Sequence, residues 1–261
     1  MSICKELDEA VQKYLRTATF PVAVKILDDA SQFPERTRRP LRDLGHKLNL
    51  CQGVALARRY GWSIGFCEED HRCANSLILM GIKEVPEFIK NGSIVSPAYT
   101  DTLEHGALTQ SITPRSERPL SAILLAPLHR ASFDPDVVLF YCNPGQAVRL
   151  VQASLYHSGG TIESKFMGRC ACASEIAVTL QTDKCQVVVP GGGEKVFGLL
   201  GDDEMVFAAP ASKLEDIVRG LADSHKAGAA RIPAPYFGLQ EEPSFPPIYA
   251  DLERHFGLRE D

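Results

Sequence analysis

The sequence lacks the long hydrophobic runs that a membrane protein needs. Its apolar stretches, such as residues 122–128, fall far short of the roughly 20 residues of a transmembrane helix. The first nine residues, MSICKELDE, contain no apolar signal core. The chain also lacks an excess of basic residues, since its formal net charge is −5 and phosphate binding requires a positive surface. We therefore expect a cytoplasmic protein that binds neither membranes nor nucleic acid.

Several common site motifs are missing as well. The chain has no C-x-x-C pair and no ferredoxin-type cysteine run, and zinc sites usually pair their cysteines closely. The glycine-rich stretch 190–195 (PGGGEK) matches neither the P-loop pattern nor the dinucleotide fingerprint. Two interpretations of it stay open, an anion-binding loop and a tight turn between two strands.

What is present is typical of a globular protein. Of the 261 residues, 44% are hydrophobic and 23% are charged, and helical and strand patterns alternate along the chain. This alternation predicts an α/β or α+β fold, a compact mixed sheet with flanking helices, in a single domain over residues 1–261 with an irregular C-terminal tail. We expect helices over 4–18, 51–60, 74–80, 144–156, 172–180 and 212–222, strands over 22–27, 62–66, 121–128, 137–142, 186–189 and 205–208, and loops over 28–49 and 97–119.

Two parts of the chain read alike, which suggests two pseudo-symmetric halves of about 1–119 and 120–226. Each part runs strand, helix, glycine, strand, loop, and then Cys-Ala at the start of a helix. The repeat equates the helix at Cys51 with the helix at Gln146, and Cys73 with Cys172. A duplication would place Cys73 and Cys172 at equivalent positions near a twofold axis.

The eight cysteines are the most informative residues. Without an export signal a disulfide framework is not expected, so they are buried apolar residues, reactive thiols or metal ligands. Cys51, Cys73 and Cys172 each fall in the first turn of an expected helix, where the helix dipole lowers a thiol pKa and favours the thiolate. Thiolates select soft metals and iron–sulfur clusters. The full set is Cys4, Cys51, Cys67, Cys73, Cys142, Cys170, Cys172 and Cys185.

Other residues offer competing interpretations. Cys142 ends a strand before a helix and is a candidate nucleophile, with His71, His105, His129 or His157 as its base. The acidic runs 68–70 and 202–204 are solvated loop faces or hard-metal ligands. The arginine-rich segment 35–47 is a solvated loop or an anion-binding arm. The cysteines themselves could all be structural.

Short motifs in a fixed order resemble the prokaryotic domain-of-unknown-function family 169. The resemblance spans roughly residues 10–225. It implies an oxygen-poor setting that suits iron–sulfur chemistry, and it implies no particular activity. Cys51, Cys73 and Cys172 match the recurrent cysteines of that family, whereas Cys67 and Cys170 match less clearly. The motifs are 20–25 (FPVAVK), 51–54 (CQGV), 73–74 (CA), 127–128 (PL), 143–150 (NPGQAVRL), 172–175 (CASE), 189–193 (VPGGG) and 203–207 (DEMVF).

The prediction is an iron–sulfur protein with a redox or small-molecule-activating role in anaerobic metabolism. We expect a 4Fe–4S cluster, which needs about four thiolates, on Cys51, Cys73, Cys172 and either Cys67 or Cys170. A redox partner protein or a small molecule would be its partner. Whether the protein is an enzyme stays open. The alternatives are a cluster-free enzyme that acts on a small ligand through a cysteine thiolate, and a non-catalytic binding protein with structural cysteines.

Overall fold

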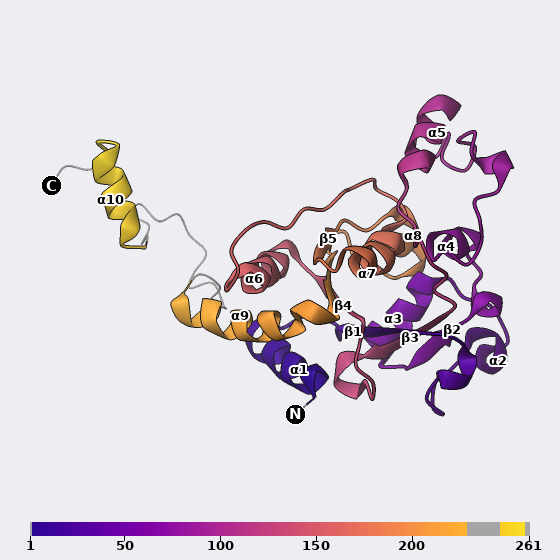
Figure 1. The fold of residues 1–261 in the computed structure, drawn as a ribbon, viewed down its shortest axis with the longest axis horizontal. Helices are drawn as coiled ribbons and strands as arrows, with labels where there is room; N and C mark the ends of the chain where they lie inside the picture. The colour runs from indigo at the N-terminus through magenta and orange to yellow at the C-terminus, as the bar shows by residue number, and fades with distance from the viewer. Residues whose placement is uncertain (1, 229–245, 259–261) are drawn as a thin grey trace. The chain divides into compact units, whose positions relative to one another are not determined.

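The computed structural model describes residues 2–228 and 246–258 (Figure 1). The chain divides into two compact units, Met1–Arg231 and Ile232–Asp261. The described part of the second unit contains the helix α10 (Ile248–His255). Most of the expected irregular tail, residues 229–245, lies outside the described residues. Everything below concerns the first unit.

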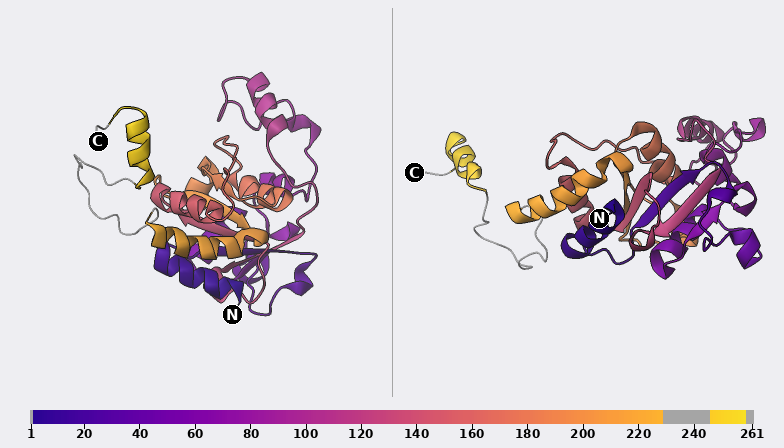
Figure 2. Two further views of the ribbon diagram at one scale, coloured as in Figure 1. Left: turned by 60° about the vertical axis from the view of Figure 1, so that its left-hand side comes forward. Right: turned by 60° about the horizontal axis from the view of Figure 1, so that its bottom comes forward.

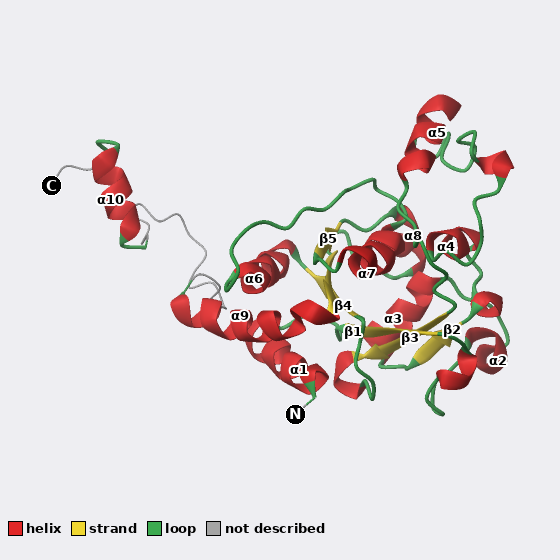
Figure 3. Ribbon diagram, in the orientation of Figure 1, coloured by secondary structure: helices red, strands yellow, loops and turns green. Residues whose placement is uncertain are grey.

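A six-stranded sheet in the order β2-β3-β1-β4-β6-β5 forms the centre of this unit (Figure 3). Neighbouring strands in that order are all antiparallel. The predicted fold class, α/β or α+β, is confirmed, although the sheet is antiparallel rather than mixed. The strands are β1 (Val22–Leu27), β2 (Ile64–Phe66), β3 (Ala122–Pro127), β4 (Val137–Cys142), β5 (Gln186–Val188) and β6 (Met205–Pro210).

Helices cover both faces of the sheet (Figure 2). Alternate residues of β4 point to opposite sides, so Leu139 and Tyr141 belong to one core and Phe140 and Cys142 to the other. The first face, called here the α3 face, carries α3 (Leu50–Tyr60), α4 (Ala74–Leu79), the π-helical turn η5 (Ala173–Val178) with α7 (Thr179–Thr182), and α8 (Gly192–Phe197). The opposite face carries α1 (Ile3–Tyr14), α6 (Pro144–Leu155) and α9 (Leu214–Ala227).

Local sequence explains where α3 lies. A capping box between Asn49 and Gln52 starts the helix, and Gly61, with a φ of 72°, ends it. Gly53 lets the helix lie directly on the sheet, because a Cβ there would come within 2.2 Å of the Phe66 ring. The start of α3, with Cys51 as its second residue, is thereby fixed over the sheet.

The strand order is symmetric about the β1–β4 pair, if β4, β5 and β6 are taken as the counterparts of β1, β2 and β3. Each half consists of a central strand, an edge strand and a strand between them, and the antiparallel directions are those that a twofold axis normal to the sheet would produce. If the halves are related, the counterparts of β1, β2 and β3 would be β4, β5 and β6, which would divide the chain between β3 and β4; the predicted halves, about 1–119 and 120–226, stay a prediction. The counterpart of α3 is the helix over 171–182, since α6 lies on the other face.

Some expected loops contain helices. The segment 28–49 includes α2 (Pro40–Leu44), and 97–119 includes α5 (Leu103–Ile112), which the Thr102 side chain caps. Residues 190–195 start the helix α8 and do not form a turn between two strands. Among the described residues, no helix combines the length and the apolar character that crossing a bilayer requires.

Candidate metal centre

Four cysteines gather on the α3 face from distant parts of the sequence. Cys51 lies in the first turn of α3, Cys73 caps α4, and Cys170 and Cys172 immediately precede η5. The Cys51 Sγ lies 3.9 Å from the Gly193 carbonyl oxygen at the start of α8. Cys51, Cys73 and Cys172 therefore lie on the same face, near Cys170, and their role as ligands stays a prediction.

Contacts between these segments fix their proximity. Asn75, two residues after Cys73, donates a hydrogen bond from Nδ2 to the Cys170 Sγ at 3.1 Å. The thiols also act on one another electrostatically, since Cys73 raises the pKa of Cys51, and Cys170 and Cys51 raise that of Cys172. All four cysteines are half-buried.

Two glutamates complete this group, which we call the thiol–carboxyl cluster: Cys51, Cys73, Cys170, Cys172, Glu175 and Glu194. Glu175 is 1% exposed and Glu194 is 5% exposed. The Tyr141 hydroxyl donates to Glu175 Oε2 at 3.4 Å, whereas Glu175 Oε1 and both Glu194 oxygens have no hydrogen-bond donor. Burial raises the pKa of both glutamates, and each carboxyl is within hydrogen-bonding reach of the other.

The expectation of easily ionised thiols is wrong for Cys51 and Cys172. Burial is the main cause that raises the pKa of Cys51 to about 12, and the charge of Glu194 adds to it. Burial and Glu194 likewise raise the pKa of Cys172 well above its ordinary value. Desolvation and neighbouring carboxyls therefore outweigh the helix dipole, which contributes only about 0.3–1 kcal/mol at a helix end. Burial thus disfavours the thiolate forms of Cys51 and Cys172, which a bound cation would stabilise.

Arg58 is a buried positive charge that acts on both glutamates of the cluster. It is 1% exposed and lies 4.3 Å from the Tyr141 ring centroid. It forms an ion pair with Glu204 at 2.7 Å and donates to the carbonyl oxygens of Gly198 at 3.3 Å and Leu199 at 2.9 Å. Arg58 thus ties α3 to the end of α8, the helix that carries Glu194.

The backbone around Cys170 and Glu175 is unusual. Cys170 has a φ of 58°, a left-handed conformation that costs a non-glycine residue about 1–3 kcal/mol. The helix that follows contains the π-helical turn η5, which places Glu175 among the thiols. Both features are rare and concentrate at functional sites, where surrounding contacts maintain them.

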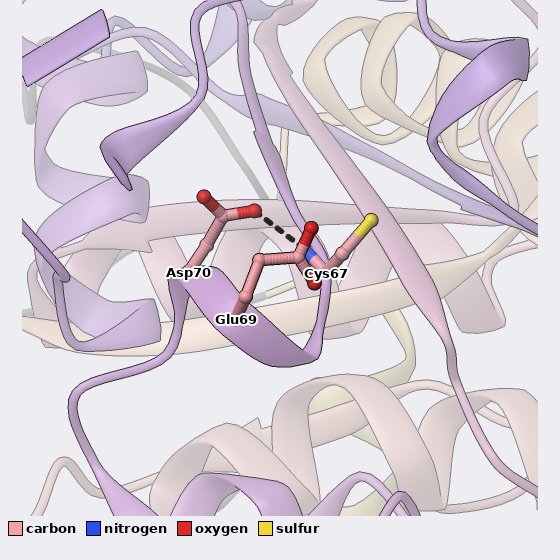
Figure 4. Close-up of side chains that lie close together, drawn as sticks. All are labelled: Cys67, Glu69 and Asp70. Carbon is pink, nitrogen blue, oxygen red and sulfur yellow. Dashed lines mark hydrogen bonds between the residues drawn. The ribbon is translucent and has the colours of Figure 1, made fainter. Parts of the chain in front are cut away.

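Cys67 lies in a different environment. Its sulfur and the carboxylates of Glu69 and Asp70 lie within 4.8 Å of one another (Figure 4). Asp70 accepts hydrogen bonds from the Cys67 backbone N–H and from Arg39, which also pairs with Glu69. Burial raises the pKa of Cys67, the charge of Arg39 lowers it, and the charges of Glu69 and Asp70 raise it. The arginine thus occupies the position that a cation would take, and the structure does not group Cys67 with the other predicted ligands.

The remaining candidates have structural surroundings. Cys142 is 2% exposed in the core of the opposite face, where burial raises its pKa to about 12. In the arginine-rich segment, Arg38 stacks on Trp62, Arg39 pairs with Asp70, and Arg42 pairs with Asp43. These side chains have partners within the protein, which favours the structural interpretation of that segment.

Sequence reasoning missed the buried carboxyls. Glu175 stands in the CASE motif and Glu194 directly follows the PGGG stretch, so both lay inside segments already singled out. Their burial was the missing information, because a glutamate in a short motif gives no sign of facing the interior. Tyr141 and Arg58 were missed for the same reason.

Comparison with known proteins places the chain in a family. Residues 10–220 match the family DUF169, described as uncharacterised ArCR. The chain belongs to this family. A relative from Methanocaldococcus jannaschii, named as an uncharacterized protein, is 28% identical over 203 residues, which cover 77% of this chain and 85% of the relative. No solved structure matches the DUF169 chain described here.

Proposed function

We propose that this DUF169 protein binds an iron–sulfur cluster, of the 4Fe–4S type, through Cys51, Cys73, Cys172 and a fourth ligand. The cluster would serve electron transfer or the activation of a small molecule, in anaerobic metabolism. The observation that carries the proposal is the convergence of these cysteines, from three helix starts, on one half-buried rim of the α3 face.

The spacing of the sulfurs favours a cluster over a single ion. Among the residues that the structure describes, the only set of three or more ligand atoms within 4.8 Å of one another is Cys67, Glu69 and Asp70. No three ligand atoms of the thiol–carboxyl cluster therefore lie within 4.8 Å of one another, yet the thiols are close enough for Cys73 to shift the pKa of Cys51, and for Cys51 and Cys170 to shift that of Cys172. A group of several irons and sulfides holds its cysteines at such wider separations.

The electrostatics also favour a highly charged cation. Without metal, burial raises the pKa of Cys51, Cys172, Glu175 and Glu194, which favours their protonated forms. Irons would replace the thiol protons and compensate the buried carboxylate charge, so metal binding should release protons. The half-buried position gives iron and sulfide a route in, and gives a partner protein or a small molecule access to the cluster.

The test is anaerobic reconstitution followed by iron and sulfide analysis and a visible spectrum. We expect a brown protein with broad absorption near roughly 400 nm. Cys73→Ser and Cys172→Ser should lower the iron content, whereas Cys4→Ser, on the opposite face, should not. A colourless protein with less than about one iron per chain, where a cubane holds about four, would refute the proposal.

A cluster-free enzyme built on Cys142 has no comparable support. The thiol of Cys142 is buried and its pKa is raised to about 12, so a thiolate at neutral pH is strongly disfavoured. Loss of a measured turnover in Cys142→Ser, with iron absent, would reverse this ranking.

A further inference from the structure

Resting on the proposed cluster, we propose that the carboxylate of Glu194 is its fourth protein ligand, so that one iron is bound by oxygen while Cys51, Cys73 and Cys172 bind the others. Cys170 then lies outside the ligand set, as a sulfur that receives a hydrogen bond from Asn75. The proposal depends on where α8 lies, on the missing partners of Glu194 and on the symmetry of the sheet.

The start of α8 is wedged between the segments that carry the cysteines. On one side the Gly193 carbonyl contacts the Cys51 Sγ. On the other side Gly191 packs so closely that a Cβ there would lie 2.8 Å from the Cα of Arg169, next to Cys170. At the far end, a Cβ on Gly198 would lie 3.4 Å from the Cys51 Cβ. Glu194 thus stands between Cys51 and the chain that leads to Cys172.

The polar neighbours of Glu194 are the Glu175 carboxyl and the charge of Arg58, and no group donates a hydrogen bond to it in the described chain. Only 5% of it is exposed, and neither carboxylate oxygen receives a hydrogen bond from a donor in the described chain. The group within hydrogen-bonding reach is another carboxyl, that of Glu175. Burying an unpartnered carboxylate is costly, and buried charges in proteins are generally paired or coordinate metals. A metal ion at the thiol–carboxyl cluster would satisfy Glu194 directly.

The palindromic topology gives an independent reason. If the β1–β4 axis relates the two halves, α3 corresponds to the helix over 171–182, and α4 corresponds to α8, since each follows an edge strand. One half then contributes Cys51 from the first helix and Cys73 from the second. The other half contributes Cys172 from the first helix, and Glu194 is the metal-ligating side chain on the second. Two ligands from each half complete a set of four.

An oxygen ligand would make one iron chemically distinct. Thiolates suit iron–sulfur clusters, whereas carboxylates are harder ligands that soft sites do not select. The iron at Glu194 would therefore be the one that exchanges its protein ligand for a small molecule with an oxygen or sulfur donor. This assigns the activating role of the proposed function to a particular corner of the cluster.

The experiment is Mössbauer spectroscopy of the full-length protein reconstituted anaerobically with ⁵⁷Fe and sulfide. An iron with an oxygen ligand gives a component with a larger isomer shift than irons bound by sulfur alone. We expect this component in the wild type and in Cys170→Ser, and we expect its loss in Glu194→Gln. Glu204→Gln is the matched control, because it makes the same change in a carboxylate that faces Arg58 rather than the sulfurs.

The outcomes separate this proposal from the one it rests on. If the wild type holds a cluster with sulfur-bound irons only, or if Cys170→Ser loses an iron while Glu194→Gln does not, Glu194 is not the ligand and the iron–sulfur function stands. If the wild type takes up no cluster, the proposed function itself fails. Urea unfolding of the metal-free variants shows whether a loss of iron in Glu194→Gln reflects a destabilised protein rather than a lost ligand.

Discussion

Arg58→Met should destabilise the metal-free protein by about 3 kcal/mol. The substitution keeps an apolar stem of similar length but removes the ion pair with Glu204 at 2.7 Å, the hydrogen bonds to the Gly198 and Leu199 carbonyls, and the guanidinium over the Tyr141 ring. Breaking a buried pair by removing one partner costs about 3–5 kcal/mol, because a charge stays behind without compensation. The Glu204 side chain is 15% exposed and can be partly hydrated, which places the expected cost at the lower end.

Arg59→Met is the matched control. Arg59 is the next residue on α3 and bonds the same two groups, the Leu199 carbonyl at 2.6 Å and Glu204 at 3.4 Å. Its side chain is 35% exposed, and exposed ion pairs contribute about 0–1 kcal/mol. The assay is urea unfolding followed by circular dichroism, with the midpoints of the two variants compared. A change below about 1 kcal/mol for Arg58→Met, or equal changes in both variants, would refute the reasoning about burial.

Three further predictions concern pH, metal and packing. Burial raises the pKa of Glu204, but its interactions with Arg58, Gly201 and Arg59 together lower it more, so its net pKa is below the usual value. Its contribution to stability is therefore complete above about pH 4.3 and is lost as the pH falls through the folded pKa. Urea midpoints should vary less across pH 3–6 in Glu204→Gln than in the wild type, and parallel pH profiles of the two proteins would contradict this prediction. Removing iron from the reconstituted protein with a chelator should lower the midpoint of thermal unfolding, because a ligand that binds only the folded state stabilises it, and an unchanged midpoint would show that the metal is not bound to the folded site. Gly53→Ala should destabilise the protein by about 1–3 kcal/mol, since its Cβ would overlap the Phe66 ring, and a change within about 0.5 kcal/mol in urea unfolding would show that α3 shifts freely.

The fold class and most elements could be predicted because they depend on local patterns. The apolar run of β4, the capping residues of α6 around Asn143 and the glycine stop after α3 are all visible in sequence. The antiparallel direction of the strands was not visible in the sequence, because it depends on which edge of the sheet each connection reaches. The helix α5 was missed because residues 103–112 show almost no amphipathic pattern, with Leu103, Leu108 and Ile112 all exposed.

The sequence suggests a repeat, which stays a prediction, and the strand order would align its two halves differently. The resemblance of the segments at Cys51 and Gln146 equates α3 with α6, whereas the strand order pairs α3 with the helix over 171–182. Short apolar helices resemble one another by chance, and only the face of the sheet that each helix covers distinguishes them. Cys172 then corresponds to Cys51 and not to Cys73.

The alignment of the two halves decides which residue of the second half would correspond to Cys73. If Cys73 and Cys172 were equivalent, the second half would have no counterpart of Cys51, and the search for a fourth ligand would turn to any nearby sulfur, such as Cys67 or Cys170. With Cys51 and Cys172 equivalent, the missing position is the counterpart of Cys73, at the start of α8. At that position the chain has glycines followed by Glu194, whose buried carboxyl receives no hydrogen bond in the described chain. A search restricted to cysteines does not reach Glu194, because a duplicated site can keep its geometry while the chemistry of one ligand changes.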